Sequence, residues 1–291
     1  MANLKLRRTQ NVNGDLYVDT SCIDCDTCRW MAPEVFYRAD EQSAVYHQPT
    51  NEAERLAALQ ALLACPTSSI GTVEKPQDIK SAQETFPIVV EENVYHCGYH
   101  SEKSYAAASY FIQHPEGNIL VDSPRFTPPL VKRLEEMGGI RYMYLTHRDD
   151  IADHQKFAEH FQCQRILHAD DISLDTRNVE IQLTGLEAFA LSGDILIIPV
   201  PGHSKGHTVL LYQNKFLFTG DHLAWSEKLH QLNAFHDFCW YSWTEQITSM
   251  RKLANYSFEW VLPGHGRRFH ADVETMHQQI HKCIDLMEAF N

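Results

Sequence analysis

Four cysteines in the first part of the chain have a spacing that suits metal ligands. Cys22, Cys25 and Cys28 are each separated by two residues in CIDCDTC, and Cys65 follows at a distance, directly before Pro66. Closely spaced thiolates on a tight loop can hold three corners of an iron–sulfur cluster, and backbone N–H groups there offset its negative charge. A zinc site more often uses two Cys-x2-Cys pairs. The three-plus-one spacing therefore favours an iron–sulfur cluster over zinc.

A second group of possible metal ligands lies in the second half of the chain. The segment LTHRDDIADHQKF holds two histidines and three aspartates between His147 and His154. Three later residues, His203, Asp221 and His265, each follow a glycine at the end of an apolar run. Glycine lets the backbone turn sharply, so these side chains can point toward a common centre. Imidazoles and carboxylates gathered in this way are ligands for zinc, iron or manganese.

Alternating apolar runs and helical patterns place these polar groups at strand ends. The expected strands are 109–114, 118–123, 142–146, 165–169, 179–183, 194–200, 208–213, 215–220 and 259–264. The expected helices are 51–64, 128–137, 153–161, 244–255 and 271–290. Many of the strands end at a histidine or an aspartate, so polar groups should meet at one edge of the sheets, where ligand sites of layered α/β proteins lie.

The composition limits the class of protein. A formal net charge of -13 argues against a general nucleic-acid binder, and 44% hydrophobic residues suffice for a sizeable core. No segment has the length and apolar character of a membrane span or signal peptide. We therefore expect no nucleic-acid or membrane partner and a location in the cytoplasm or the reducing interior of an organelle. The remaining cysteines, Cys97, Cys163, Cys239 and Cys283, are expected to be free thiols.

The predicted domain organisation is a small domain at 1–75, a linker at 76–87 and a large domain at 88–291. The stretch TVEKPQDIKSAQETFP is polar, contains two prolines and has no apolar periodicity, which is typical of a linker.

Residues 15–72 resemble the bacterial-type ferredoxin family, on CIDCDTC and the later Cys65-Pro66. Two-cluster members carry a second cysteine run before the last Cys-Pro. Here NEAERLAALQALLA occupies that space, and its Leu and Ala spacing predicts an amphipathic helix. The resemblance implies one [4Fe-4S] cluster, held by Cys22, Cys25, Cys28 and Cys65.

Residues 88–291 look like the metallo-β-lactamase superfamily, because His147, His203, Asp221 and His265 occur in the order and spacing of that family. The resemblance implies a four-layer αββα sandwich with one or two zinc or iron ions at the edge between its sheets. The whole chain is then expected to be α+β, a small ferredoxin-like domain followed by this sandwich. Asp122, at the end of NILVDS, matches a supporting aspartate of the family.

The loop that starts at Thr146 departs from the T-H-x-H-x-D-H pattern of that family. Asp149 stands where the family has its second histidine, and Asp153 and His154 come two positions late. A carboxylate in place of imidazole shifts the preference toward iron or manganese, although zinc also accepts carboxylates. Asp150 is an alternative to Asp149, and Asp153 has an alternative role as the N-cap of the helix that follows.

The resemblance implies two ligand sets that share one residue. The first set is His147, Asp149 and His203, the second is Asp153, His154 and His265, and Asp221 bridges them. It also implies that Asp221 and Asp153 act in catalysis, Asp153 by orienting the attacking hydroxide, and that His207 has at most a supporting role.

Three functions are compatible with this site. Two bridged metals would bring the pKa of a shared water near neutrality, which predicts a hydrolase for a small-molecule ester, thioester, amide or phosphodiester. The cysteine cluster supports an alternative, a di-iron oxidoreductase for oxygen, nitric oxide or sulfur chemistry that receives electrons from the cluster and from an electron-transfer partner protein. A third hypothesis is an electron carrier or redox sensor with a non-catalytic large domain.

Overall fold

The computed structural model describes residues 2–290 and divides into two compact units. The first unit comprises the residues up to His114 together with Pro124–Gly139, and the second comprises Pro115–Ser123 and the residues from Ile140 onward. The expected linker lies inside the first unit and is not featureless, because it contains the helix α3 (Ile79–Glu84). Ala82 of α3 is buried, which explains why a short polar stretch is ordered there.

The first unit begins with a small α/β arrangement. Strand β1 (Leu16–Val18) pairs antiparallel with β4 (Ile70–Thr72), and β2 (Phe36–Ala39) pairs with β3 (Gln42–Val45). Helix α1 (Thr27–Met31) follows the cysteine loop, and α2 (Glu52–Ala64) begins after Asn51, whose side chain accepts a hydrogen bond from the backbone of Glu54. The core of this part includes Cys28 and Cys65 among its apolar side chains. Two of the four predicted ligand cysteines are therefore part of the core.

The rest of the first unit is an antiparallel run of strands and a helix. Strand β5 (Ile88–Glu91) pairs with β6 (Val94–His96), and β6 pairs with β7 (Tyr110–Ile112). Helix α4 (Pro128–Glu136) starts with proline at its first position, where the missing N–H costs nothing.

The second unit contains two larger sheets. One is parallel and consists of β8 (Ile119–Val121), β9 (Tyr142–Tyr144), β10 (Gln164–His168) and β11 (Ile181–Leu183). The other has the order β12 (Phe189–Ala190), β13 (Ile195–Pro199), β14 (Thr208–Tyr212), β15 (Phe216–Gly220), β18 (Trp260–Pro263), β19 (Phe269–His270). A short hairpin, β16 (Ala224–Ser226) and β17 (Gln231–Asn233), follows β15. Each expected strand therefore exists.

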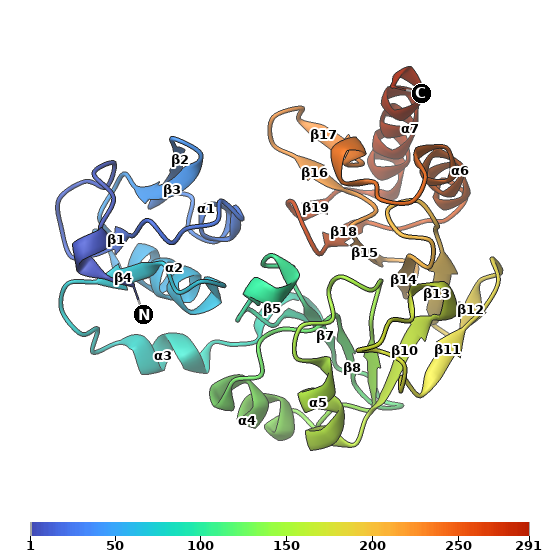
Figure 1. Cartoon of the computed structure of the whole chain (residues 1–291), viewed down its shortest axis with the longest axis horizontal. Coiled ribbons are helices and arrows are strands. Elements are labelled where there is room, and N and C mark those ends of the chain that lie inside the picture. The colour runs from blue at the N-terminus through green and yellow to red at the C-terminus, as the bar shows by residue number, and fades with distance from the viewer. Residues whose placement is uncertain (1, 291) are drawn as a thin grey trace. The chain divides into compact units, whose positions relative to one another are not determined.

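Helices cover both sides of these sheets. In Figure 1, α5 (His154–Phe161) lies beside the parallel strands, whereas α6 (Trp243–Leu253) and α7 (Val273–Ala289) lie beyond β14 and β15. Ile247 and Met250 of α6 and Ile280 of α7 share one core with Val209 and Leu217 of the six-stranded sheet. The second unit thus has the expected layer order, helix, sheet, sheet, helix.

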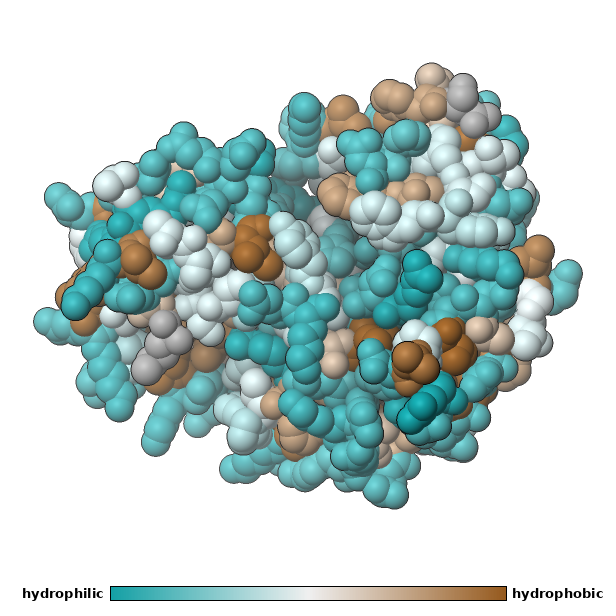
Figure 2. All heavy atoms as spheres, in the orientation of Figure 1, coloured by the Kyte–Doolittle hydropathy of each residue, from teal (hydrophilic) through white to brown (hydrophobic). Residues whose placement is uncertain are grey.

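The surface agrees with the charged composition. On the face drawn in Figure 2, most residues are hydrophilic and the hydrophobic ones form small separate groups. Within residues 2–290, no helix is long and apolar enough to span a bilayer.

Candidate metal centres

The four predicted cluster ligands line one pocket of the first unit: Cys22, Cys25, Cys28 and Cys65. Asp24 and Asp26, between the first three cysteines, have left-handed backbone angles, with φ of 58° and 64°. Arg29 holds both aspartates, with its Nη1 2.7 Å from Asp24 Oδ1 and its Nε 2.5 Å from Asp26 Oδ1. The turn that presents the thiols to one pocket is therefore fixed by a buried arginine.

Backbone donors lie beside two of the sulfur atoms. The backbone N–H of Ser43 donates to Cys22 Sγ at 3.4 Å, and that of Ser69 donates to Cys65 Sγ at 3.3 Å. Burial raises the pKa of the Cys25 thiol to about 11, so the thiolate form needs an added positive charge at this place. Donors aimed at sulfur and cysteines that require a cation fit an iron–sulfur cluster.

The second site is built at the ends of four strands of the second unit. The loops after β9, β13, β15 and β18 supply the polar side chains, because each strand delivers its last residues to the same edge. The predicted residues that lie near one another are His147, Asp149, Asp150, His203, Asp221 and His265.

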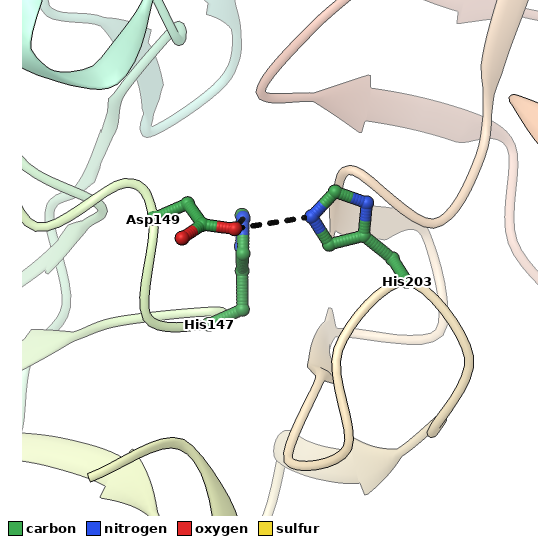
Figure 3. Close-up of side chains that lie close together, drawn as sticks. All are labelled: His147, Asp149 and His203. Atoms are coloured by element: carbon green, nitrogen blue, oxygen red, sulfur yellow. Dashed lines mark ion pairs between the residues drawn. The ribbon is translucent and has the colours of Figure 1, made fainter. Parts of the chain in front are cut away.

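Two histidines and two carboxylates face one another at the centre of this site. Asp149 Oδ2 lies 3.4 Å from His203 Nε2 and 3.8 Å from His147 Nε2, as Figure 3 shows for these three side chains. Asp221 Oδ2 lies 3.7 Å from each of the same nitrogens. Neither His147 Nε2 nor His203 Nε2 has a hydrogen-bond partner within residues 2–290. Buried nitrogens directed at two carboxylates are suited to bind a metal ion.

The other oxygen of Asp221 faces a third histidine. His265 Nδ1 lies 2.7 Å from Asp221 Oδ1. Burial alone would raise the pKa of Asp221, but the charge and hydrogen bond of His265 outweigh it and hold this pKa well below the usual range. With Oδ2 toward His147 and His203 and Oδ1 toward His265, the Asp221 carboxylate has the orientation that a bridging ligand needs.

Asp150 is the most unusual group of the site. It is 1% exposed, and in the described part of the chain neither carboxylate oxygen has a hydrogen-bond partner. Burial and then the nearby charge of Asp221 raise the pKa of Asp150 well above the ordinary value. Only a glycine fits beside it, since a Cβ on Gly264 would lie 2.7 Å from Asp150 Oδ2. A buried, unpaired carboxylate is costly unless a cation compensates it.

Thr146 and Asp122 set the orientation of the His147 ring through its Nδ1 atom. His147 Nδ1 lies 3.0 Å from Thr146 Oγ1, and the Thr146 hydroxyl donates to Asp122 at 3.0 Å. Burial lowers the pKa of His147 to about 4, so the ring is neutral near pH 7 and Nε2 keeps its lone pair for a metal. His207 Nε2 accepts the backbone N–H of Asp221 at 3.1 Å, which is a supporting contact.

Asp171 holds two of the ligand loops together and was not identified from the sequence. Its carboxylate accepts the backbone N–H of Arg148 at 3.1 Å, the hydroxyl of Ser204 at 2.5 Å and the backbone N–H of Gly206 at 2.8 Å. It lies in a 3-10 helix directly after β10, so the rule that strands here end in acidic residues could have found it.

Asp153 and His154 lie at the start of α5, where they contact other side chains. Asp153 Oδ1 is 3.0 Å from Lys156 Nζ, and Arg165 Nη1 donates to His154 Nδ1 at 3.2 Å. Neither belongs to the two groups of converging metal-ligand atoms found within residues 2–290. Their role as ligands stays a prediction, and Asp150 is the carboxylate that the structure brings next to Asp221.

Known proteins resemble each part of the chain. Residues 18–72 match the family model of the 4Fe-4S single cluster domain of ferredoxin I. An uncharacterized protein of Bacillus subtilis, YmaE, is 27% identical over 122 residues, which cover 41% of this chain and 44% of that protein. The matched region therefore spans less than half of that relative.

Solved structures resemble the larger part. The DIM-1 metallo-β-lactamase has a TM-score of 0.54 at 19% identity, with 70% of this chain and 96% of that chain covered. The BLEG-1 B3 metallo-β-lactamase has a TM-score of 0.52 at 17% identity, with 67% and 99% covered. The chain combines a 4Fe-4S ferredoxin domain with a metallo-β-lactamase fold. The α+β class and both expected resemblances are thereby confirmed, and the two parts imply an iron–sulfur cluster and metal ions.

Proposed function

We propose that this protein is a metal-dependent hydrolase with a dinuclear site in its metallo-β-lactamase fold and one [4Fe-4S] cluster in its ferredoxin domain. The observation that carries the proposal is Asp150, a buried carboxylate with no protein partner in the described chain, placed beside Asp221. A single cation would leave part of the negative charge of Asp150 and Asp221 uncompensated. The other ligands beside Asp221, His147 and His203, bind a metal as neutral imidazoles and add no charge.

The ligands divide into two sets around Asp221. His147, Asp149 and His203 would hold one ion, and Asp150 with His265 would hold the other. Asp149 has a side chain that is 47% exposed, so this first ion would lie nearer to solvent and substrate. Two carboxylates beyond the bridging one favour a hard ion, iron or manganese, more than a site made only of histidines does. Asp153 and His154 are the competing second-set ligands.

The metal ions would supply a water of near-neutral pKa and polarise the oxygen of the scissile group. The protein's part is to orient and to hold charge. Thr146 and Asp122 keep His147 in the tautomer that presents Nε2, Asp171 holds the loops of His147 and His203 in register, and Asp221 remains ionised at neutral pH. The Asp149 carboxylate, half exposed, is placed to accept a proton from a water that enters the site.

Exposed aromatic rings beside His203 indicate the character of the substrate. The backbone N–H of Trp240 donates to His203 O at 3.0 Å, and the Trp240 ring centre lies 6.3 Å from that of His203. Trp240 is 59% exposed and Phe238 is 58% exposed, and the centres of their rings lie 6.0 Å apart. Large exposed aromatics next to a metal ligand mark a binding surface, so we propose a small-molecule substrate with an apolar group near the scissile bond.

The ferredoxin domain supports a second candidate, a di-iron oxidoreductase. Hydrolysis needs no electrons, whereas a cluster and a carboxylate-rich site in one chain would suit iron chemistry with electrons delivered by a partner protein. The two candidates differ in the metal of the large site and in the effect of reducing the cluster.

Metal analysis of anaerobically purified protein, combined with electron paramagnetic resonance, tests the proposal. We expect about four cluster irons plus one or two further ions, which Asp221→Asn removes, and hydrolysis of chromogenic esters or phosphodiesters that is unchanged when the cluster is reduced. Iron in the large site with turnover that requires reductant would favour the second candidate. Cluster iron alone would contradict both.

A further inference from the structure

The segment Asp122–Arg125 contacts the loop of His147 and Asp150 at one end and the carbonyls that lead into Cys65 at the other. Asp122 and Ser123 belong to the second unit and Pro124 and Arg125 to the first. Every contact used below lies inside one unit. Nothing in the sequence marks this segment beyond the aspartate that ends NILVDS.

At its far end, Arg125 closes the region around the fourth cluster ligand. Its Nη2 donates to Leu63 O at 2.8 Å and to Cys65 O at 3.1 Å. The backbone N–H of His100 donates to Ala64 O, between them, at 3.1 Å. The last carbonyls of a helix have no partner within the helix, and here α2 ends at Ala64. Arg125 thus satisfies the carbonyls that lead into Cys65 and fixes the position of that ligand.

At its near end, the segment supports the ligands of the metal site. Asp122 Oδ1 accepts the backbone N–H of Thr146 at 2.8 Å, one residue before His147. The backbone N–H of Ser123 donates to Asp150 O at 3.2 Å. Asp122 also has a φ of 56°, a left-handed conformation that is costly for a residue other than glycine. Such a conformation persists only when its surroundings enforce it.

The connection between the two ends is short and stiff. Only Ser123 and Pro124 separate Asp122 from Arg125. The proline ring fixes φ of Pro124 at about -65°, and the residue before a proline is confined to extended conformations. Fewer backbone rotations than in an ordinary tetrapeptide are therefore available to absorb a displacement of Arg125.

We propose that the segment Asp122–Arg125 couples the cluster to the metal site, so that an intact cluster strengthens metal binding and loss of the cluster weakens it. This inference rests on the proposed function, because it assigns a regulation to that metal site. The cluster ties Cys65 to the loop of Cys22, Cys25 and Cys28, and Arg125 passes the position of Cys65 to Asp122 and Ser123. Arg125 is a positioning residue of both sites and a ligand of neither.

Coupling between two sites is reciprocal, which makes the proposal testable from both sides. The probe is Mn²⁺, which suits carboxylates and is bound poorly by the free thiols of cluster-free protein. Free Mn²⁺ is measured by electron paramagnetic resonance in full-length protein with and without the cluster, and Asp221→Asn gives the background. We expect removal of the cluster to lower Mn²⁺ affinity by about fivefold or more. By the same linkage bound Mn²⁺ should stabilise the cluster, which is measured as slower loss of the cluster absorption when Mn²⁺ is present.

Arg125→Met should lower Mn²⁺ affinity while the cluster is present, and removal of the cluster should then have little further effect. Arg125→Lys, which can reach one carbonyl but not both, should be intermediate. Arg133→Met is the matched control, because Arg133 lies in α4 and its side chain is half exposed and pairs with the exposed Glu136 at 3.1 Å. Circular dichroism checks that each variant is folded.

Three results would overturn the coupling. Equal Mn²⁺ affinity with and without the cluster would overturn the coupling but not the proposed function. The same holds if the cluster changes the Mn²⁺ affinity of Arg125→Met as much as that of the wild type. Absence of any Mn²⁺ binding that Asp221→Asn removes would instead contradict the proposed function, and the coupling with it.

Discussion

The two centres of this protein satisfy their buried polar groups in different ways. In the cluster pocket, Ser43 and Ser69 direct backbone N–H groups at the ligand sulfurs, and Arg29 neutralises the aspartates of the turn. In the metal site, both oxygens of Asp150 and the Nε2 atoms of His147 and His203 have no protein partner within residues 2–290. The cysteine pocket thus has protein donors beside its polar groups, whereas the candidate metal site leaves buried groups that a cation could compensate.

The largest expected effect is the loss of one centre while the other is retained. Asp221→Asn removes the bridging carboxylate and should abolish stoichiometric metal in the large site, while the visible absorption of the cluster remains. Cys65→Ser should abolish the cluster absorption and leave metal binding detectable, although weaker. Elemental analysis and absorption spectra of both variants check this, and loss of both centres in either variant would show that they do not form independently.

A smaller effect on metal affinity is expected from Asp171, which holds the ligand loops in place but is not itself a metal ligand. Asp171→Asn leaves an amide that cannot accept all the donors of Arg148, Ser204 and Gly206, so metal affinity should fall about 10–100-fold. Asp170→Asn is the control, because Asp170 is exposed and pairs with Lys205 at 2.9 Å. Competition with a chromophoric chelator measures the affinities, and equal affinities for the two variants would contradict the role of Asp171.

Asp150, a buried carboxylate without a protein partner in the described chain, should also affect the free energy of unfolding. In metal-free protein, Asp150→Asn should raise the free energy of unfolding by about 1–3 kcal/mol, because a buried carboxylate without partners is removed. The same change should weaken metal binding. Asp153→Asn removes the charge that faces the exposed Lys156 and should change stability by about 1 kcal/mol or less.

Urea unfolding of the two metal-free variants provides the measurement. Loss of metal in Asp153→Asn but not in Asp150→Asn would restore the assignment made from the sequence alone.

The smallest effect concerns a carboxylate that does have its partner. Glu180 accepts hydrogen bonds from Arg165, one of them at 2.7 Å. Although burial alone would raise the pKa of Glu180, these hydrogen bonds hold it below its usual value. Its contribution to stability is therefore full above about pH 4.5 and is lost as the pH falls through the lowered pKa.

Glu180→Gln should destabilise the metal-free protein by about 0.5–1 kcal/mol at pH 7, the opposite sign to Asp150→Asn, and the difference should disappear in acid. Thermal unfolding of wild type and variant at pH 7 and near pH 3 measures it. A difference that persists unchanged at low pH would mean that the ion pair is not its source.

The sequence predicted that Cys22, Cys25, Cys28 and Cys65 lie together because this information is local. Three of these cysteines lie in one turn, and Cys65 is marked by the proline that follows it. The convergence of His203, Asp221 and His265 was predicted from the glycine-flanked strand ends that carry them. The positions of side chains that depend on packing between distant loops were not predicted.

Asp150, Asp171 and Arg125 illustrate this limit. Which of three aspartates in one loop turns inward depends on the space left by Gly264, more than one hundred residues away. Asp171 and Arg125 act on backbone groups of other loops, and no spacing rule along the chain encodes such contacts.

Anomalous diffraction at the iron and zinc edges, from crystals grown anaerobically, tests the central claim most directly. We predict one strong iron peak within the four cysteines and one or two separate peaks bounded by His147, Asp149, Asp150, His203, Asp221 and His265. An absence of metal between these side chains, or an ion held by Asp153 and His154 away from Asp150, would contradict the account.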